Sequence, residues 1–207
     1  MKQRRYWTIS AVLFFLLLLG IGRIGMRWQQ GYSPDSIQNI LLISIDTCRA
    51  DHFGCYGDPR AITPNLDRLA AESISFENVI APVPLTLPSH CSMLTGTNPV
   101  YHGVHDNLDY ELGNEHVTLA EILRDQGFTT GGLVSAFVLD SRFGLAQGFD
   151  SWDDQFEEER LVGNMSERVG GEAARRAIRW LQDHRQERCF YFLHFYDPHH
   201  KYEPPEP

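Results

Sequence analysis

The chain has few residues of the kind that cross-link a fold or build a structural zinc site. It holds four cysteines in 207 residues, at Cys48, Cys55, Cys91 and Cys189. No two of them form a Cys-x-x-Cys pair, so a structural zinc site is not indicated. Cys48 and Cys55 are near enough in sequence to pair as a disulfide. All four cysteines lie among apolar residues, however, which favours small buried side chains instead.

Positive charge is scarce beyond the first 30 residues. Residues 1–30 contain five basic residues and no acidic one, so residues 31–207 hold 13 of the 18 basic residues and all 27 acidic ones. An acidic surface of this kind repels a phosphate backbone. Nucleic acid is therefore not an expected partner. With 43% hydrophobic and 22% charged residues, the composition is that of a globular protein.

Long apolar runs are also rare, and the longest lies near the N-terminus. Tyr6–Gly22 has no charged residue and follows three basic ones. As a helix it would span about 25 Å, the short end of what crosses a bilayer core. We predict a signal-anchor or transmembrane segment at 1–26 and a polar linker at 27–38; cleavage as a signal peptide remains open. Either alternative predicts an extracytoplasmic domain, periplasmic or on the cell surface.

From residue 39 onward, predicted strands and helices alternate. The continuous apolar run Ile40–Ile45 predicts a strand buried on both faces. Further strands are predicted at Ile74–Ile80, Thr129–Val138 and Cys189–Phe195, with a loop at Gly148–Arg160. Helices are predicted from Thr63-Pro64, at Pro88–Leu94, from the capping box Thr118–Glu121 to Gly127, and at Glu167–Arg185. This order predicts an α/β fold, a mostly parallel central sheet flanked by helices, in one domain at 39–207.

Polar residues follow two of the predicted strands. Asp46 comes directly after Ile40–Ile45, and the segment Asp197–His199 follows Cys189–Phe195. In open parallel sheets, ligands bind at the carboxyl ends of the strands. The carboxylate of Asp46 is a hard oxygen ligand that could bind a divalent cation. A helix N-cap or a turn residue is the alternative role for Asp46.

Thr86 stands two residues before the predicted helix at Pro88. A threonine there is a good N-cap, which is its plain structural role. The same position places a hydroxyl in the positive field of a helix N-terminus, which stabilises an alkoxide and an anionic substrate. Coordination to a metal ion would lower the pKa of that hydroxyl further and make Thr86 a nucleophile.

Three other polar residues are candidates for binding substrate or moving protons. His90 lies one helical turn after Thr86 and could bind a substrate oxyanion or tune the nucleophile. Asn107 lies in a loop rich in histidine and could donate to a developing oxyanion. His199, after the last predicted strand, could protonate a leaving group. Each of these histidines could equally be an ordinary core or surface side chain.

Three ordered blocks of sequence together resemble the sulfatase family of the alkaline phosphatase superfamily. The blocks read NILLISIDTCRADHFGCYG at 39–57, TLPSHCSMLTG at 86–96 followed by His102-Gly103-Val104, and FYFLHFYDPHHKY at 190–202. The resemblance covers about residues 39–207. It implies a hydrolase of sulfuric or phosphoric esters that uses a divalent metal ion: calcium, magnesium, manganese or zinc.

The resemblance assigns roles to individual positions. Asp46 falls at a metal-ligand position, and Thr86 falls where sulfatases carry a cysteine that is converted to formylglycine. His90 falls where that signature has arginine. Asn107 matches an amide that binds the substrate oxyanion, and His199 matches the histidine of the third block. Asp46 and Thr86 are therefore the expected metal ligands, and Thr86, His90, Asn107 and His199 the expected catalytic residues.

The departures from the family pattern shape the expected chemistry. Threonine cannot become formylglycine, so a direct threonine alkoxide is expected at Thr86. Relatives with threonine there tend to be phosphodiesterases, phosphonate hydrolases or phosphoglycerol transferases, so the expected substrates are sulfate or phosphate esters. The Lys-x-His element of sulfatases is missing, with Leu133–Ala136 in its place. The expected second metal-ligand pair, an Asp-His late in the fold, is also missing.

These departures leave two alternatives to a hydrolase. One is a transferase of the same fold that passes a phospho-group to an envelope glycan or lipid. The other is an inactive fragment, because one carboxylate and one hydroxyl are too few ligands for a stable divalent site. The sequence favours the N-terminal part of a larger membrane-anchored hydrolase, incomplete at its C-terminus, whose partners are the ester substrate and the membrane.

Overall fold

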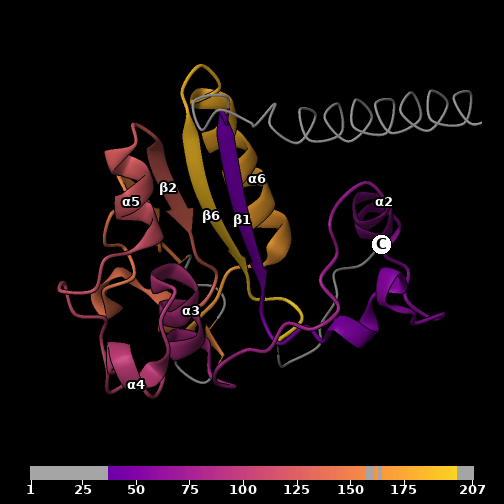
Figure 1. The fold of residues 1–207 in the computed structure, drawn as a ribbon, viewed down its shortest axis with the longest axis horizontal. Coiled ribbons are helices and arrows are strands. Elements are labelled where there is room, and N and C mark those ends of the chain that lie inside the picture. The colour runs from indigo at the N-terminus through magenta and orange to yellow at the C-terminus, as the bar shows by residue number, and fades with distance from the viewer. Residues whose placement is uncertain (1–36, 157–160, 163–164, 200–207) are drawn as a thin grey trace, which may run out of the picture. The chain divides into compact units, whose positions relative to one another are not determined.

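A computed structural model describes residues 37–156, 161–162 and 165–199 of the chain (Figure 1). The predicted signal-anchor at 1–26 and most of the predicted linker lie outside these residues, as do His200 and the residues after it. Within the described ranges, no helix combines the length and apolarity needed to cross a membrane. The compact unit begins at Asn39.

The centre of this unit is a parallel sheet with the strand order β1-β6-β2-β3. The strands are β1 (Asn39–Ile45), β6 (Cys189–Phe195), β2 (Thr129–Leu133) and β3 (Ser151–Asp153). β1 and β6 pair in register along their whole length, from Asn39 opposite Cys189 to Ile45 opposite Phe195. The predicted parallel α/β fold is therefore confirmed. The register brings the residues that follow β1 and β6 to the same edge.

Side chains of β6 alternate between two hydrophobic layers, as the pleat of a strand requires. Phe190 and Phe192 belong to the larger cluster, with Leu87 of α3 (Thr86–Thr95) and Ala120 of α5 (Leu119–Asp125). Tyr191 and Leu193 face the other way and pack with Ala173 and Ala177 of α6 (Gly170–Asp183). Figure 1 shows α6 on one side of the strands and α3 and α5 on the other.

β1 is only partly buried, although its sequence predicts burial on both faces. It pairs with β6 on one side and is a terminal strand of the four-stranded sheet. Leu41 is 47% exposed and Ile43 48% exposed, and both point to the same face because they are two residues apart. Their intervening neighbour Leu42 packs against the larger cluster. The apolar run of β1 indicates that the segment tends to be buried, but it does not indicate whether a strand lies on each side of it.

The prediction of a strand at Ile74–Ile80 is wrong. The segment has no ladder partner, and Ile74, Phe76, Val79 and Ile80 are all highly exposed. Its alternation of Ile, Phe and Val matches the strand pattern, but a strand also needs a neighbour whose main chain pairs with it.

The strand predicted at Thr129–Val138 is also shorter than expected. It ends at Leu133, and a 3-10 turn, η4, occupies Phe137–Leu139. The loop predicted at Gly148–Arg160 contains the short strand β3. A second, two-stranded sheet is formed by β4 (Leu161–Val162) and β5 (Met165–Ser166), which pair antiparallel.

The helices appear where capping and periodicity predict them, with shifted ends. α5 begins with the predicted capping box: the Thr118 hydroxyl accepts from Glu121 N–H, and the Glu121 carboxylate accepts from Thr118 N–H. α6 begins at Gly170, not at Glu167, which instead pairs with Ala136 in an isolated bridge.

The remaining elements are short. The turns η2 (Ala50–His52) and η3 (Gly54–Tyr56) follow β1, and η5 (Ser141–Phe143) follows η4. α2 (Pro64–Ala71) starts at Pro64 as predicted, and α4 (Pro99–His102) follows α3. All four cysteines are free. Cys91 and Cys189 are buried as predicted, but Cys55 is exposed and Cys48 only half-buried, so the prediction of burial fails for these two.

Candidate active site

Asp46 and Thr86, 40 residues apart in sequence, meet beyond the end of β1. The Thr86 hydroxyl donates to Asp46 Oδ2 at 3.2 Å. Asp46 is 7% exposed and continues the ladder, since its N–H donates to Phe195 O. The next residue, Thr47, has φ 51°, a left-handed conformation that is strained for a β-branched residue. The chain therefore turns sharply just after it delivers the carboxylate.

The Asp46 carboxyl is held in its ionised form. Burial by itself raises the pKa of a carboxyl, but the hydrogen bond from His194 and the nearby imidazoles of His90 and His199 outweigh it. The net effect places the pKa of Asp46 below its ordinary value. The Asp46 carboxylate, whose hydrogen-bond donors are a hydroxyl and an imidazole, is therefore able to bind a cation or to accept a proton.

Thr86 is the first residue of α3, and Leu85 is the N-cap. The helix therefore begins two residues before the predicted Pro88, and the Thr86 hydroxyl does not cap it. The adjoining Leu87 N–H donates to Asn107 Oδ1 at 2.9 Å. The Asn107 side-chain oxygen thus pairs with one of the N–H groups that lack a partner within the first turn of α3.

His90 is buried directly behind Thr86, with both ring nitrogens engaged. Nδ1 lies 2.7 Å from Thr86 O and must donate, because a carbonyl only accepts. Nε2 lies 2.8 Å from the hydroxyl of Ser44, which then donates to it. Burial, together with the neighbouring His194, lowers the pKa of His90 to about 4, so the ring is neutral. His90 holds the first turn of α3 against β1; its nitrogens do not face an open site.

His199 approaches the same carboxylate from the segment after β6. Its N–H donates to Tyr196 O, and its ring stacks on Tyr196 with the centroids 4.2 Å apart. Burial raises the pKa of Tyr196 to about 12, so the phenol stays protonated. His199 is half-buried and close enough to lower the pKa of Asp46. An imidazole in this place can give a proton to a group bound beside Asp46.

The structure adds residues that sequence reasoning did not assign. His194 Nε2 lies 3.3 Å from Asp46 Oδ2, and its ring makes an edge contact with His90 at 5.0 Å. Ser44 and Ser135 each bond one of the two buried imidazoles. His194 and Ser44 lie inside apolar strands; a polar residue in a predicted buried run is the signal that could have identified them.

The donors at this point suit a hard divalent cation in part. Asp46 and Thr86 provide a carboxylate and a hydroxyl oxygen, which are the ligand types that magnesium and calcium prefer. Within residues 37–156, 161–162 and 165–199, no cluster of three or more His, Cys, Asp or Glu side chains has a metal-binding arrangement. Asp46 and Thr86 bring these two oxygens to one point.

The comparisons with known proteins agree on one family. The family model for sulfatases matches residues 38–207. An ulvan-active sulfatase of Formosa agariphila is 36% identical over 161 residues, which are 73% of this chain and 30% of that protein. This chain therefore spans less than a third of the relative it matches.

Solved structures share the fold. One structure is described as bound to its substrate D-glucosamine-2-N,6-O-disulfate and is 25% identical to this chain, with a TM-score of 0.67. The match covers 81% of this chain and 36% of the other. A Vibrio parahaemolyticus protein of the alkaline phosphatase superfamily has a TM-score of 0.65 and 19% identity over 82% of this chain and 43% of its own. The fold is thus like that of this alkaline phosphatase superfamily protein, and the family model shows that the chain belongs to the sulfatase family.

Proposed function

We propose that this chain carries the nucleophile of a metal-dependent hydrolase of sulfate or phosphate esters, and that Thr86 is that nucleophile. One observation carries the proposal: the Thr86 hydroxyl, at the first residue of a helix, donates to the buried carboxylate of Asp46 at 3.2 Å. The family match to residues 38–207 supports ester hydrolysis as the reaction class.

The roles follow from the geometry. The Thr86 hydroxyl gives its proton to Asp46 Oδ2, to which it donates at 3.2 Å. Thr86 Oγ1 then forms a bond to sulfur or phosphorus, and the bond from that atom to the ester oxygen breaks. His199 gives its proton to the departing oxygen, and water then releases the group from Thr86. The N-terminus of α3 favours the anionic group, and the Asn107 amide nitrogen is the donor for an equatorial oxygen. His90 acts from behind, by keeping the first turn of α3 in place.

A divalent ion of the kind that sulfatases generally use would be held in part by Asp46 and Thr86. When bound, such an ion supplies Lewis-acid stabilisation of charge on the attacking oxygen. The ion could be calcium, magnesium or manganese, which oxygen ligands suit, or zinc, which also accepts a carboxylate oxygen.

The test is ester hydrolysis by the protein expressed from its intact natural gene, with and without Thr86→Ala. The substrates are aryl sulfate, aryl phosphate monoester, aryl phosphodiester and phosphonate, together with a sulfated sugar. Thr95→Ala is the matched control, because Thr95 lies on the same helix and its hydroxyl donates to Cys91 O. Loss of turnover of about 10³-fold or more in Thr86→Ala alone supports the nucleophile. Equal rates in both variants contradict it.

The covalent intermediate provides a second readout. Rapid acid quench followed by mass spectrometry should find a sulfated or phosphorylated Thr86, and high-resolution mass separates sulfur from phosphorus. Repeating the reaction with an added polyol acceptor distinguishes hydrolysis from transfer, since a transferase releases a new ester in place of the free anion.

We also propose that residues 1–26 hold the protein at a membrane with the catalytic domain on the extracytoplasmic side. The basic lead and the uncharged run Tyr6–Gly22 support this. Alkaline extraction of membranes, combined with N-terminal sequencing of the mature protein, tests it. An extractable protein that begins after residue 26 would indicate a cleaved signal peptide instead.

A further inference from the structure

His194 has no solvent exposure, and its two ring nitrogens have different partners. The N–H of Ser135 donates to Nδ1 at 3.3 Å, so Nδ1 carries a lone pair and no proton. Because Nδ1 accepts, the proton of the imidazole is on Nε2. That nitrogen faces Asp46 Oδ2 at 3.3 Å, the same oxygen that accepts from Thr86.

Ser135 holds His194 through two separate bonds. The Ser135 N–H bonds the ring of His194, and the Ser135 hydroxyl donates to His194 O at 2.7 Å. Ser135 therefore contacts both the ring and the main chain of the same residue. Ser135 is itself fully buried, two residues beyond the end of β2. Its position depends on the segment after β2, which leaves the sheet at this point.

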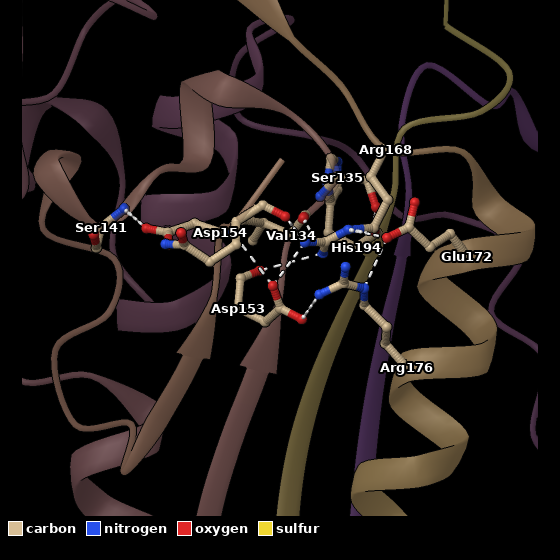
Figure 2. Close-up of polar contacts among 10 residues, drawn as sticks. Val134, Ser135, Ser141, Asp153, Asp154, Arg168, Glu172, Arg176 and His194 are labelled. Atoms are coloured by element: carbon tan, nitrogen blue, oxygen red, sulfur yellow. Dashed lines mark hydrogen bonds and ion pairs between the residues drawn. The ribbon is translucent and has the colours of Figure 1, made fainter. Parts of the chain in front are cut away.

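Arg168 secures that segment. Its Nη1 donates to Val134 O at 2.9 Å, and its main-chain N–H donates to Ser135 O at 3.0 Å. Its Nη2 bonds Asp153 Oδ1 at 2.7 Å and Gln155 O at 2.6 Å. Figure 2 shows Arg168 between the ends of the strands, with Ser135 and His194 beside it. The Arg168 side chain is 1% exposed.

We propose that Ser135 and Arg168 are positioning residues that hold His194 as a fixed Nε2–H donor to Asp46. The proposal rests on the proposed function, in which Asp46 serves Thr86. With the ring fixed in this form, Asp46 Oδ2 receives two donors from defined directions and stays aimed at the Thr86 hydroxyl. A ring with its proton on Nδ1 would turn a lone pair toward the carboxylate and would clash with Ser135 N–H.

The first test is direct and needs no substrate. Nitrogen NMR of the natural-gene protein, with labelled histidine, separates protonated from unprotonated ring nitrogens, and His194→Gln identifies the resonances. We expect a proton on Nε2 of His194 and none on Nδ1. A proton on Nδ1, or on both nitrogens, would overturn the proposal whatever the protein catalyses.

Arg168→Lys and Arg176→Ala form a matched pair for the supporting residue. Both arginines bond Asp153 and lie near Glu172, but only Arg168 reaches Val134 O. Arg168→Lys should give a mixture of the two His194 tautomers, whereas Arg176→Ala should leave the wild-type signal. If both variants keep the wild-type signal, Arg168 is not a positioning residue.

Turnover tests the same idea through His194, even if Arg168→Lys does not fold. His194→Gln places an amide N–H near the Nε2 position, whereas His194→Asn places one near Nδ1. We expect the Gln variant to keep at least about tenfold more activity than the Asn variant, which is the size of one charge-assisted hydrogen bond. Equal activities would contradict the role of the Nε2 donor. A wild-type protein without ester turnover would refute the proposed function and leave the NMR result to decide this inference.

Discussion

Asp46 and Asp153 occupy equivalent places in the fold, yet their surroundings differ completely. Asp46 follows β1 directly, and Asp153 is the last residue of β3, so both lie at the carboxyl end of a parallel strand. Asp46 accepts from the hydroxyl of Thr86 and the imidazole of His194. Asp153 bonds two guanidinium groups, those of Arg168 at 2.7 Å and Arg176 at 3.2 Å (Figure 2).

This difference shows that a place at the end of a strand does not assign a role. Two arginines pair with Asp153, so guanidinium groups already occupy its oxygens. Asp46 accepts instead from a hydroxyl and an imidazole. The charges around a carboxylate, more than its position in the topology, distinguish a candidate catalytic group from a structural one.

Exchanging the two carboxylates for amides should give the largest contrast. Asp46→Asn should lower ester turnover by about 10³-fold, because it removes the proposed metal ligand and the charge that faces Thr86. Asp153→Asn should leave turnover per folded molecule close to wild type. Steady-state kinetics with active-site titration checks this. Similar losses in both variants would remove the distinction between the two sites.

Stability should show the reverse order. Asp153→Asn removes the 2.7 Å carboxylate partner of the buried Arg168 and leaves Glu172 at 3.8 Å, so it should cost about 2 kcal/mol. The cost is less than for a fully buried pair, because the Asp153 side chain is 30% exposed. Asp46→Asn keeps an acceptor for Thr86 and His194 and should cost about 1 kcal/mol or less. Urea unfolding with equal slopes for the variants measures both. A larger loss in Asp46→Asn would contradict the assignment.

The two arginines beside Asp153 should themselves differ. Arg176 is 34% exposed, and Arg176→Ala should cost under about 1 kcal/mol, as for other partly solvated ion pairs. Arg168→Ala should cost more, because four of its bonds hold buried main chain or Asp153. Arg179→Ala is the control, because Arg179 is exposed and lies on α6, the helix that carries Arg176. Equal losses for Arg168 and Arg176 would show that burial does not set their contributions.

The smallest effect is expected at a third carboxylate near the end of β1. Arg49 pairs with Asp51 at 2.6 Å, but both side chains are more than half exposed. Arg49→Ala should leave the urea midpoint unchanged, because solvent screens the pair. A measurable loss would mean that distance, not burial, sets the strength of these pairs.

Several features could be read from the sequence because they depend on local patterns. The α5 capping box needs only Thr118 and Glu121 at the right spacing, and β6 is identified to the residue by its apolar run. Asp46 and Thr86 were found from short motifs, and the structure brings them together. The strand expected at Ile74–Ile80 failed, because the same alternation needs a partner that no local pattern specifies.

By itself, the sequence determined the fold class, the family and the two residues at the centre of the candidate site. These depend on periodicity, capping and ordered motifs, all of which are local along the chain. The tertiary structure alone decided that His194 joins Asp46, that Ser44 and Ser135 bond two buried imidazoles, and that Arg168 pairs with Asp153. Partner choice and protonation depend on contacts between residues up to 148 positions apart, and such contacts exist only once the strands have paired.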